Sequence, residues 1–191
     1  FNDSGGARIQ EGINSLEGCG NLFYMNTLCS GKVPQITAIM GPCAGAASYS
    51  PALTDFIFQV KKTGNLFITG PKVVKEAIGE DTTIEELGGF KTHAHKSGVT
   101  HFVAEDDKDC INQIKKLIKF LPQSSYSLPP KQKSKQNKNT NISEIVPTNP
   151  RLSYDVKDVI TCIFDEGFFC EIHKDWAKSI VCSLSRIDGY S

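Results

Sequence analysis

Asp3-Ser4-Gly5-Gly6-Ala7-Arg8 and Gly41-Pro42-Cys43-Ala44-Gly45-Ala46-Ala47 are the two stretches that decide the fold of this chain. Both are glycine-rich turns, and the pattern predicts a helix directly after each of them and a strand directly before the second. The first N–H groups of a helix have no partner within it and carry a partial positive charge. Two such turns facing one pocket would stabilise the oxygen of a carbonyl as it becomes an enolate. The sequence therefore predicts enolate stabilisation by backbone N–H groups.

The elements around these turns follow the order of an α/β protein. Apolar residues at helical spacing predict a helix that begins near Ile9 and stops by Gly31, and the uncharged run 35–40 predicts a buried parallel strand that ends at the Gly41-Pro42 break. The sequence next predicts a small-residue helix over 44–53, strands at 55–60 and 66–69, short helices at 73–78 and 85–89, a strand at 102–104 and an amphipathic helix over 110–121. This alternation is typical of a parallel sheet covered by helices.

Residues 122–150 differ in composition from the segments on either side. Between Pro122 and Ser143 the chain has no acidic residue and carries four lysines: Lys131, Lys133, Lys135 and Lys138. This composition predicts a linker. A basic arm for nucleic acid is the functional alternative, but no aromatic residue is interleaved with the lysines and the 21 basic residues of the chain are balanced by 21 acidic ones.

A second domain is predicted to begin after the linker. A helical pattern over 155–164 is followed by strand-like runs at 168–172 and 179–184, and residues 186–191 have the composition of a hairpin turn. The predicted organisation is therefore 1–121, the linker 122–150, and the opening of a second domain over 151–191. Because the chain of 191 residues begins at Phe1 with no strand before the first turn, we expect it to be a piece of a longer protein.

Composition narrows the class of protein. With 39% hydrophobic residues and no apolar run of about 18 residues, the chain predicts a soluble protein with no membrane partner. Its seven cysteines are scattered and lack C-x₂-C pairs, which favours free thiols in a reducing compartment. Cys43 lies beside a predicted helix start, which makes it a candidate nucleophile, but burial in the turn is the favoured interpretation.

Three histidines, His93, His95 and His101, lie close together in the sequence. Their spacing suggests a metal site, but no cysteine or pair of acidic residues lies nearby to complete a ligand set. Structural roles are favoured, and the sequence predicts no metal.

Taken together, these motifs resemble the carboxyltransferase (beta) subunits of propionyl-CoA carboxylase and their close relatives. The resemblance rests on motifs that occur in the expected order: DSGGARIQEG from Asp3, GPCAG from Gly41, YSPALTDF from Tyr49, FITGP from Phe67 and ELGG from Glu86. It continues through His93, Ser97-Gly98-Val99 and His101 to Tyr154-Asp155-Val156 and Phe168-Phe169, so it covers nearly the whole chain apart from the lysine-rich linker.

The resemblance implies a pair of crotonase-like (ClpP/crotonase) domains with the ββα superhelix. This chain would contain the latter part of the first, acyl-CoA-binding domain and the start of the second. Carboxybiotin, carried by a biotin carboxylase or carrier partner, would deliver carbon dioxide and accept the α-proton of the thioester, and the resulting enolate would attack the carbon dioxide. The resemblance also implies a homo-oligomer, usually a hexamer, in the bacterial cytoplasm or the mitochondrial matrix.

Carried over residue by residue, the resemblance assigns the backbone N–H groups of Gly45 and Ala46 as oxyanion donors, with Gly5 and Gly6 lining the other side. Ala7, Arg8, Ala44 and Tyr49 are the candidates for contact with the acyl-CoA. Arg8 has two competing assignments, CoA phosphate or an ion pair with Glu11 or Asp3. Packing is the competing assignment for Tyr49.

One departure from the family pattern bears on activity. The family usually has a second glycine where this chain has Ala46, and alanine is unfavourable if the position needs a positive φ or if its methyl group meets the thioester. An inactive structural subunit is therefore an alternative, as is the carboxyltransferase subunit of a biotin-dependent decarboxylase. The run Asp3-Ser4-Gly5-Gly6 also resembles the nucleophile motif of trypsin-like proteases, but the histidine and aspartate of that triad would have to precede it.

Overall fold

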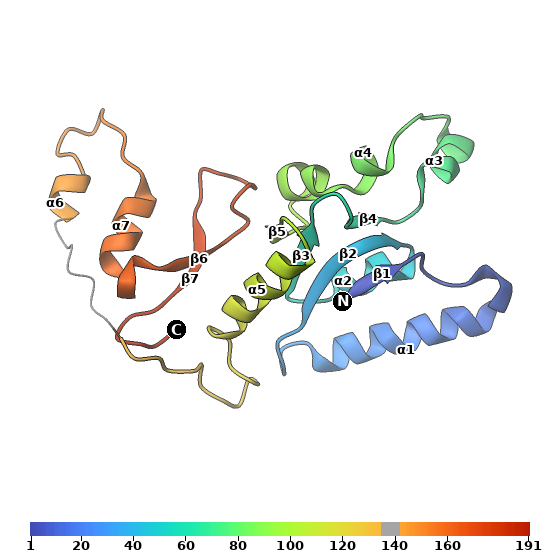
Figure 1. The fold of residues 1–191 in the computed structure, drawn as a ribbon, viewed down its shortest axis with the longest axis horizontal. Helices are drawn as coiled ribbons and strands as arrows, with labels where there is room; N and C mark the ends of the chain where they lie inside the picture. The colour runs from blue at the N-terminus through green and yellow to red at the C-terminus, as the bar shows by residue number, and fades with distance from the viewer. Residues whose placement is uncertain (135–141) are drawn as a thin grey trace.

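The computed structural model describes residues 1–134 and 142–191, which form two sheets of unequal size (Figure 1). The larger sheet is wholly parallel and contains β1 (Asn2–Ser4), β2 (Ile36–Ala44), β3 (Phe56–Val60), β4 (Asn65–Phe67) and β5 (Phe102–Ala104). The smaller one is an antiparallel hairpin of β6 (Phe169–Ile172) and β7 (Cys182–Ser185). The parallel sheet and its helices confirm the predicted α/β class.

β2 is the centre of the parallel sheet. Its first half pairs with β3 and its second half with β4, while β1 lies along its other edge and β5 extends the sheet beyond β3. The prediction that this strand ends before Gly41 is wrong, because β2 continues through Pro42 to Ala44. Proline is tolerated where a ladder is irregular, and the register between β1 and β2 shifts between Asn2 and Ser4.

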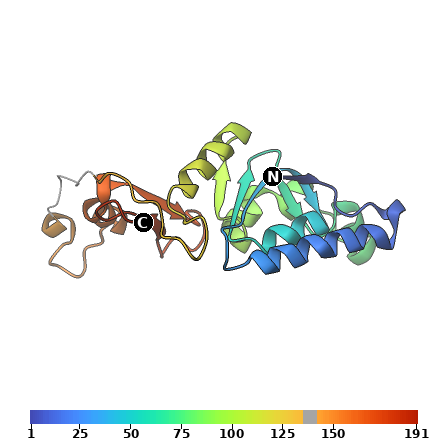
Figure 2. The same cartoon turned by 90° about the horizontal axis from the view of Figure 1, so that it is seen from below.

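Each face of the parallel sheet has its own core, because successive strand residues point to opposite faces. On one face the stacked rings of Phe58 and Phe102, 4.5 Å apart, pack under α5 (Asp107–Ile118). On the other face Ile39 and Ile57 pack beside α2 (Ala46–Ala52). Figure 2 shows α5 on one side of the sheet and α2 on the other, together with the long helix α1 (Ile13–Cys29).

The short helices end where the sequence predicts. α3 (Pro71–Ile78) begins with proline at its first position and stops at Gly79, whose φ is 76°. α4 (Ile84–Gly88) has a capping box formed by Thr83 and Glu86. The π-helical turn η2 (Thr92–Ser97) follows α4, and the sequence pattern did not predict it.

The second half of the chain contains α6 (Ile142–Ile145), α7 (Val156–Ile163), η3 (Asp165–Gly167) and the β6–β7 hairpin. Ile172 and Leu184 of the hairpin pack against the α5 side of the parallel sheet. After β7 an isolated antiparallel bridge joins Ile187 to Tyr190 across a tight turn, which confirms the predicted hairpin turn.

Part of the predicted linker packs against the rest of the molecule. Residues 122–134 contain no helix or strand, yet Ser125 donates its N–H to the carbonyl of Lys32 at 2.8 Å, and Gln132 donates to Gly189 at 3.0 Å. The remaining lysines of the run, Lys135 and Lys138, lie outside the described residues. No helix within residues 1–134 or 142–191 combines the length and the apolar character needed to cross a bilayer.

Candidate active site at the carboxyl edge of the parallel sheet

Three parallel strands, β1, β2 and β4, end at the same edge of the sheet. The residues that follow them are Gly5 and Gly6, Gly45 and Ala46, and Ile68 respectively. A ligand site in an open α/β sheet usually lies at this carboxyl edge. The two glycine turns and the end of β4 therefore form the candidate site.

Gly6 brings the first turn directly against the second. Its φ is +90°, and a Cβ atom built on it would overlap the carbonyl oxygen of Ala44 and lie 3.5 Å from the amide nitrogen of Ala46. Only glycine fits so close to another backbone. The contact confirms the prediction that the two turns lie side by side.

The first turn leads into a single 3₁₀ turn and not directly into an α-helix, which corrects the prediction for this turn. The 3₁₀ turn η1 (Ile9–Glu11) follows it, and α1 begins only at Ile13, after Gly12 with a φ of 56°. The N–H of Gly6 donates to the Oγ of Ser4 at 3.2 Å. The helix-start argument therefore applies to the second turn alone.

The second turn gives Gly45 a role other than the predicted one. The backbone of Gly45 has φ 55° and ψ −122°, and its N–H donates to the carbonyl of Ile68 at 3.1 Å. An N–H that already has a partner is not free for a ligand, so in this structure Gly45 does not fit the predicted role of oxyanion donor. Its place is to hold the turn against the end of β4.

Ala46 and Ala47 supply the unpaired N–H groups of this turn. They are the first two residues of α2, so their N–H groups have no acceptor within the helix, and no other acceptor faces them in residues 1–134 and 142–191. Ala46 is helical and is not among the residues with positive φ. The backbone objection to alanine at this position therefore does not apply, because the positive φ falls on Gly45.

An apolar cavity of about 440 Å³ lies beside the second turn. It is bounded by α2, the end of β4, α3, α4 and the start of η2. Its walls are Ser48, Tyr49, Ala52, Leu66, Phe67, Ile68, Thr69, Val74, Leu87, His93 and Val99. Clefts of this size and character take small molecules with apolar parts.

The side chains predicted to contact acyl-CoA lie around these features. Tyr49 lines the cavity and meets Phe23 edge to face at 6.2 Å, so it combines the predicted contact position with packing. Arg8 is exposed, and its Nη1 lies 3.0 Å from Oε1 of Glu11, which is one of its two predicted assignments. Ala44 is the last residue of β2 and touches Gly6 through its carbonyl.

Cys43 and His101 have structural surroundings. Cys43 is fully buried, and burial raises the pKa of its thiol, which confirms the favoured interpretation of a buried turn residue over a nucleophile. The Nδ1 of His101 accepts the N–H of Ile57 at 3.0 Å, and its ring stacks on His173 with centroids 4.4 Å apart. Among the described residues, no cluster of three or more histidine, cysteine or acidic side chains has the arrangement of a metal site.

His93 is a part of the site that sequence reasoning placed only among the structural histidines. Its Nε2 lies 2.5 Å from the carbonyl oxygen of Leu66 and its Nδ1 lies 2.9 Å from the Oγ of Ser97. The contact with β4 depends on the π-helical turn η2, which no local sequence pattern predicts.

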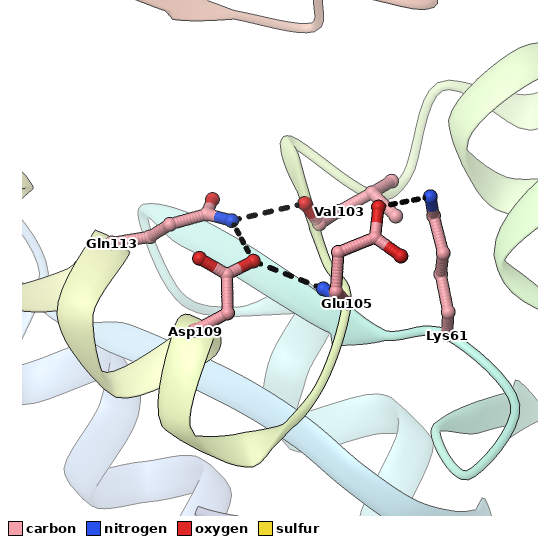
Figure 3. Close-up of polar contacts among 5 residues, drawn as sticks. All are labelled: Lys61, Val103, Glu105, Asp109 and Gln113. Carbon is pink, nitrogen blue, oxygen red and sulfur yellow. Dashed lines mark hydrogen bonds and ion pairs between the residues drawn. The ribbon is translucent and has the colours of Figure 1, made fainter.

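A second cavity, of about 450 Å³, lies between β5 and the end of β6 and has a charged lining. Figure 3 shows the partners of three of its polar side chains: Lys61 pairs with Glu105, and Gln113 donates both to the carbonyl of Val103 at 3.2 Å and to Asp109 at 2.8 Å. We place the candidate active site at the apolar cavity because α2, whose first two N–H groups are unpaired, lines it.

Known proteins match this chain along its whole length. The family model for the carboxyl transferase domain matches residues 1–191. The carboxyltransferase subunit of propionyl-CoA carboxylase from Haloferax mediterranei is 49% identical over 194 residues, and the alpha subunit of methylmalonyl-CoA decarboxylase from Propionigenium modestum is 48% identical. Each alignment covers 100% of this chain and 38% of the relative.

The structural comparison agrees with the sequence comparison. The crystal structure of transcarboxylase 12S, described as a hexamer assembly with hydrolyzed methylmalonyl-coenzyme A bound, superimposes with a TM-score of 0.96 at 49% identity and covers 100% of this chain and 38% of that one. This likeness confirms the crotonase-like fold. The chain, which spans 38% of the length of these relatives, belongs to the carboxyl transferase domain family.

Proposed function

We propose that this chain forms the acyl-CoA half of a biotin-dependent carboxyltransferase. The reaction would move a carboxyl group from carboxybiotin to the α-carbon of a short acyl-CoA, with propionyl-CoA as the favoured substrate. The observation that carries this proposal is the pair of unpaired N–H groups on Ala46 and Ala47, at the start of the helix that lines the apolar cavity. Family membership and the 49% identity to a propionyl-CoA carboxylase subunit support it.

The N–H of Ala46 would donate to the thioester oxygen as the α-carbon loses its proton. Negative charge then develops on that oxygen, and fixed donors stabilise it without having to reorganise. The backbone of Gly5 and Gly6 would line the opposite side, since Gly6 lies against the carbonyl of Ala44. Carboxybiotin, when bound, would supply the carboxyl group, and we assign residues of this chain only to the acyl-CoA side.

Four side chains or backbone positions are proposed to bind the rest of the acyl-CoA. Ala44 supplies the carbonyl that Gly6 contacts, Ala7 directly follows Gly6 in the chain, and Tyr49 lines the cavity. Arg8 would exchange its exposed ion pair with Glu11 for a CoA phosphate, because exposed pairs of this kind stabilise a protein by only about 0–1 kcal/mol. A bidentate contact with phosphate is the stronger interaction.

The partners are proposed on the same basis. A biotin carboxylase or biotin carrier would deliver the carboxyl group, and the full-length subunit would assemble as a hexamer, as described for transcarboxylase 12S. All seven cysteines are free in this structure, which supports a reducing compartment such as the bacterial cytoplasm or the mitochondrial matrix.

The experiment replaces Ala46 with proline in the full-length protein. Proline fits the first position of a helix but has no N–H, so Ala46→Pro removes the proposed donor and preserves α2. We expect propionyl-CoA carboxylation, assayed with the biotin partner, to fall by about 10² to 10³. Ala46→Gly keeps the N–H and should retain activity, and acetyl-CoA serves as the comparison substrate. Full activity of Ala46→Pro would refute the donor role.

A second function is favoured by a specific observation, the 48% identity to a methylmalonyl-CoA decarboxylase subunit. That reaction uses the same enolate in the opposite direction, so the site does not distinguish the two. Assaying decarboxylation of methylmalonyl-CoA beside carboxylation of propionyl-CoA assigns the direction. Absence of turnover in both assays would favour the remaining alternative, an inactive structural subunit.

A further inference from the structure

The end of β4 carries two backbone carbonyls that are held by two different groups. The carbonyl of Ile68 accepts the N–H of Gly45, while the carbonyl of Leu66 accepts a hydrogen bond from the ring of His93. Within residues 1–134 and 142–191, β4 pairs with β2 alone, so no strand of the described chain lies along its outer edge. His93 takes the place of a strand at that edge.

The ring of His93 is held in its orientation by two neighbouring groups. The carbonyl of Leu66 only accepts, so Nε2 donates to it, while Nδ1 shares a hydrogen bond with the hydroxyl group of Ser97. Both ring nitrogens are therefore engaged. His93 has no free nitrogen for proton transfer, and its contribution is geometric.

The backbone of His93 is anchored to the core by a buried chain of hydrogen bonds. Thr100 donates its N–H to the carbonyl of His93 at 3.2 Å and its hydroxyl to Oε1 of Gln59 at 2.6 Å. The amide group of Gln59, which is fully buried, donates to the carbonyls of Gly64 at 2.9 Å and Gly88 at 3.0 Å. Gly64 directly precedes β4, and Gly88 is the last residue of α4. The hydrogen bonds of Gln59 therefore hold in place the two segments next to β4.

From these contacts we propose that His93 is a positioning residue: by holding the Leu66 carbonyl it fixes the end of β4, so that the Ile68 carbonyl holds Gly45 and aims the N–H groups of Ala46 and Ala47 into the site. This inference rests on the proposed function. A displacement of about 1 Å at a site of this kind costs up to about 10² in rate. His93 acts through β4 and Gly45 and is not itself required to touch the reacting atoms.

Two substitutions separate the two ring nitrogens. The side-chain amide of glutamine reaches about as far as Nε2, and that of asparagine only as far as Nδ1. His93→Gln therefore keeps a donor for the Leu66 carbonyl, and His93→Asn keeps only the contact with Ser97. His95→Asn, on the same π-helical turn but outside the apolar cavity, is the control for substitution in this segment.

In the full-length protein with its biotin partner, we expect His93→Asn to lower kcat by about 10- to 100-fold. KM for propionyl-CoA should change by no more than about threefold, because substrate binding depends mainly on groups other than the N–H groups of Ala46 and Ala47. His93→Gln should recover most of the lost kcat, and His95→Asn should match the wild type.

Backbone hydrogen exchange of the same full-length proteins gives a readout that does not depend on turnover. His93→Asn should speed exchange in peptides covering residues 41–53 and 65–70, and His93→Gln should not. Equal kcat losses in both variants, or unchanged exchange at 41–53 in His93→Asn, would overturn the positioning role. A wild type that is inactive in both directions yet shows the expected exchange pattern would overturn the proposed function and leave the structural link from His93 to Gly45 supported.

Discussion

His101 is placed where the two sheets meet, and its ring is more tightly constrained than its sequence context suggests. Its Nδ1 accepts the N–H of Ile57, its carbonyl accepts the N–H of His173, and its ring stacks on the His173 ring. Burial, together with the smaller effect of the neighbouring His173, lowers the pKa of His101 from its ordinary value of 6.5 to about 4. The neutral form is thus the form that fits this position.

The stability of the folded protein should therefore fall in acid. Between pH 6.5 and about 4 the unfolded chain binds a proton at His101 that the folded chain does not, so stability is present above pH 6.5 and is lost as pH falls toward 4. We expect the thermal midpoint of the full-length protein to fall over this range. His101→Asn offers an acceptor to Ile57 without titrating, so its curve should be flatter, and parallel curves for the two proteins would contradict the assignment.

At the scale of elements, the turn before β4 and the end of α4 are joined by a side chain from β3, the strand that precedes β4 in the chain. Gln59 is fully buried, and its amide bonds to Gly64, Gly88 and Thr100. Buried polar groups are costly to leave without partners. One glutamine thus determines whether the turn before β4 and the end of α4 stay in place.

Replacing Gln59 with leucine should destabilise the full-length protein strongly. The change leaves two carbonyls and one hydroxyl without their partner, at a cost of about 1–3 kcal/mol for each group that water does not reach. Urea unfolding measures the loss. Gln113→Leu removes the two hydrogen bonds of a side chain that is only partly buried (Figure 3), and it should cost clearly less; equal losses would show that burial of Gln59 is not the cause.

Most elements could be predicted from sequence because their signals are local. Pro71 and Gly79 mark both ends of α3, and the alternation of apolar runs with glycine breaks locates β3 and β5. Three features could not be predicted this way. β2 passes through Pro42 because its neighbours leave an irregular ladder there, η2 has a rare helical type, and the helix after the first turn is delayed by the positive φ of Gly12.

The sequence predicts the kind of site, a pair of glycine-rich turns, but not which backbone N–H groups are free to donate. The glycine pattern predicts that the two turns meet, and the contact of Gly6 with Ala44 confirms it. The sequence pattern does not predict that the N–H of Gly45 donates to the carbonyl of Ile68, because this hydrogen bond joins the ends of two strands that are apart in the sequence. Which N–H groups remain free for a ligand depends on the tertiary structure, and in this structure the proposed donors are those of Ala46 and Ala47.

At the scale of the whole molecule, the segment between β6 and β7 makes a tight contact with the first unit at Gly98, in addition to the packing of the hairpin on the sheet. A Cβ atom built on Gly98, whose φ is +69°, would lie 2.8 Å from the ring of Trp176. His173 of the same segment donates its N–H to His101 at 3.0 Å. The indole therefore rests directly on the backbone of the first unit.

Gly98→Ala should displace Trp176 as well as strain the backbone. Gly79→Ala is the matched control, since Gly79 has a similar φ of +76° but open space around it. In the full-length protein both changes should destabilise the fold by about 1 kcal/mol or more, because alanine is strained at positive φ. Only Gly98→Ala should make Trp176 more accessible to acrylamide quenching, and equal quenching in both variants would argue against the contact.

The all-parallel sheet also has a consequence for synthesis on the ribosome. The outer edge of β3 is completed only when Phe102 arrives to pair with Phe58, which lies 44 residues earlier in the chain. At about 5–20 residues per second, that edge stays open for roughly 2 to 9 s during translation. An uncovered edge of Phe, Ile and Val is the kind of surface on which nascent chains aggregate, so the newborn protein should need chaperones most before β5 has left the exit tunnel.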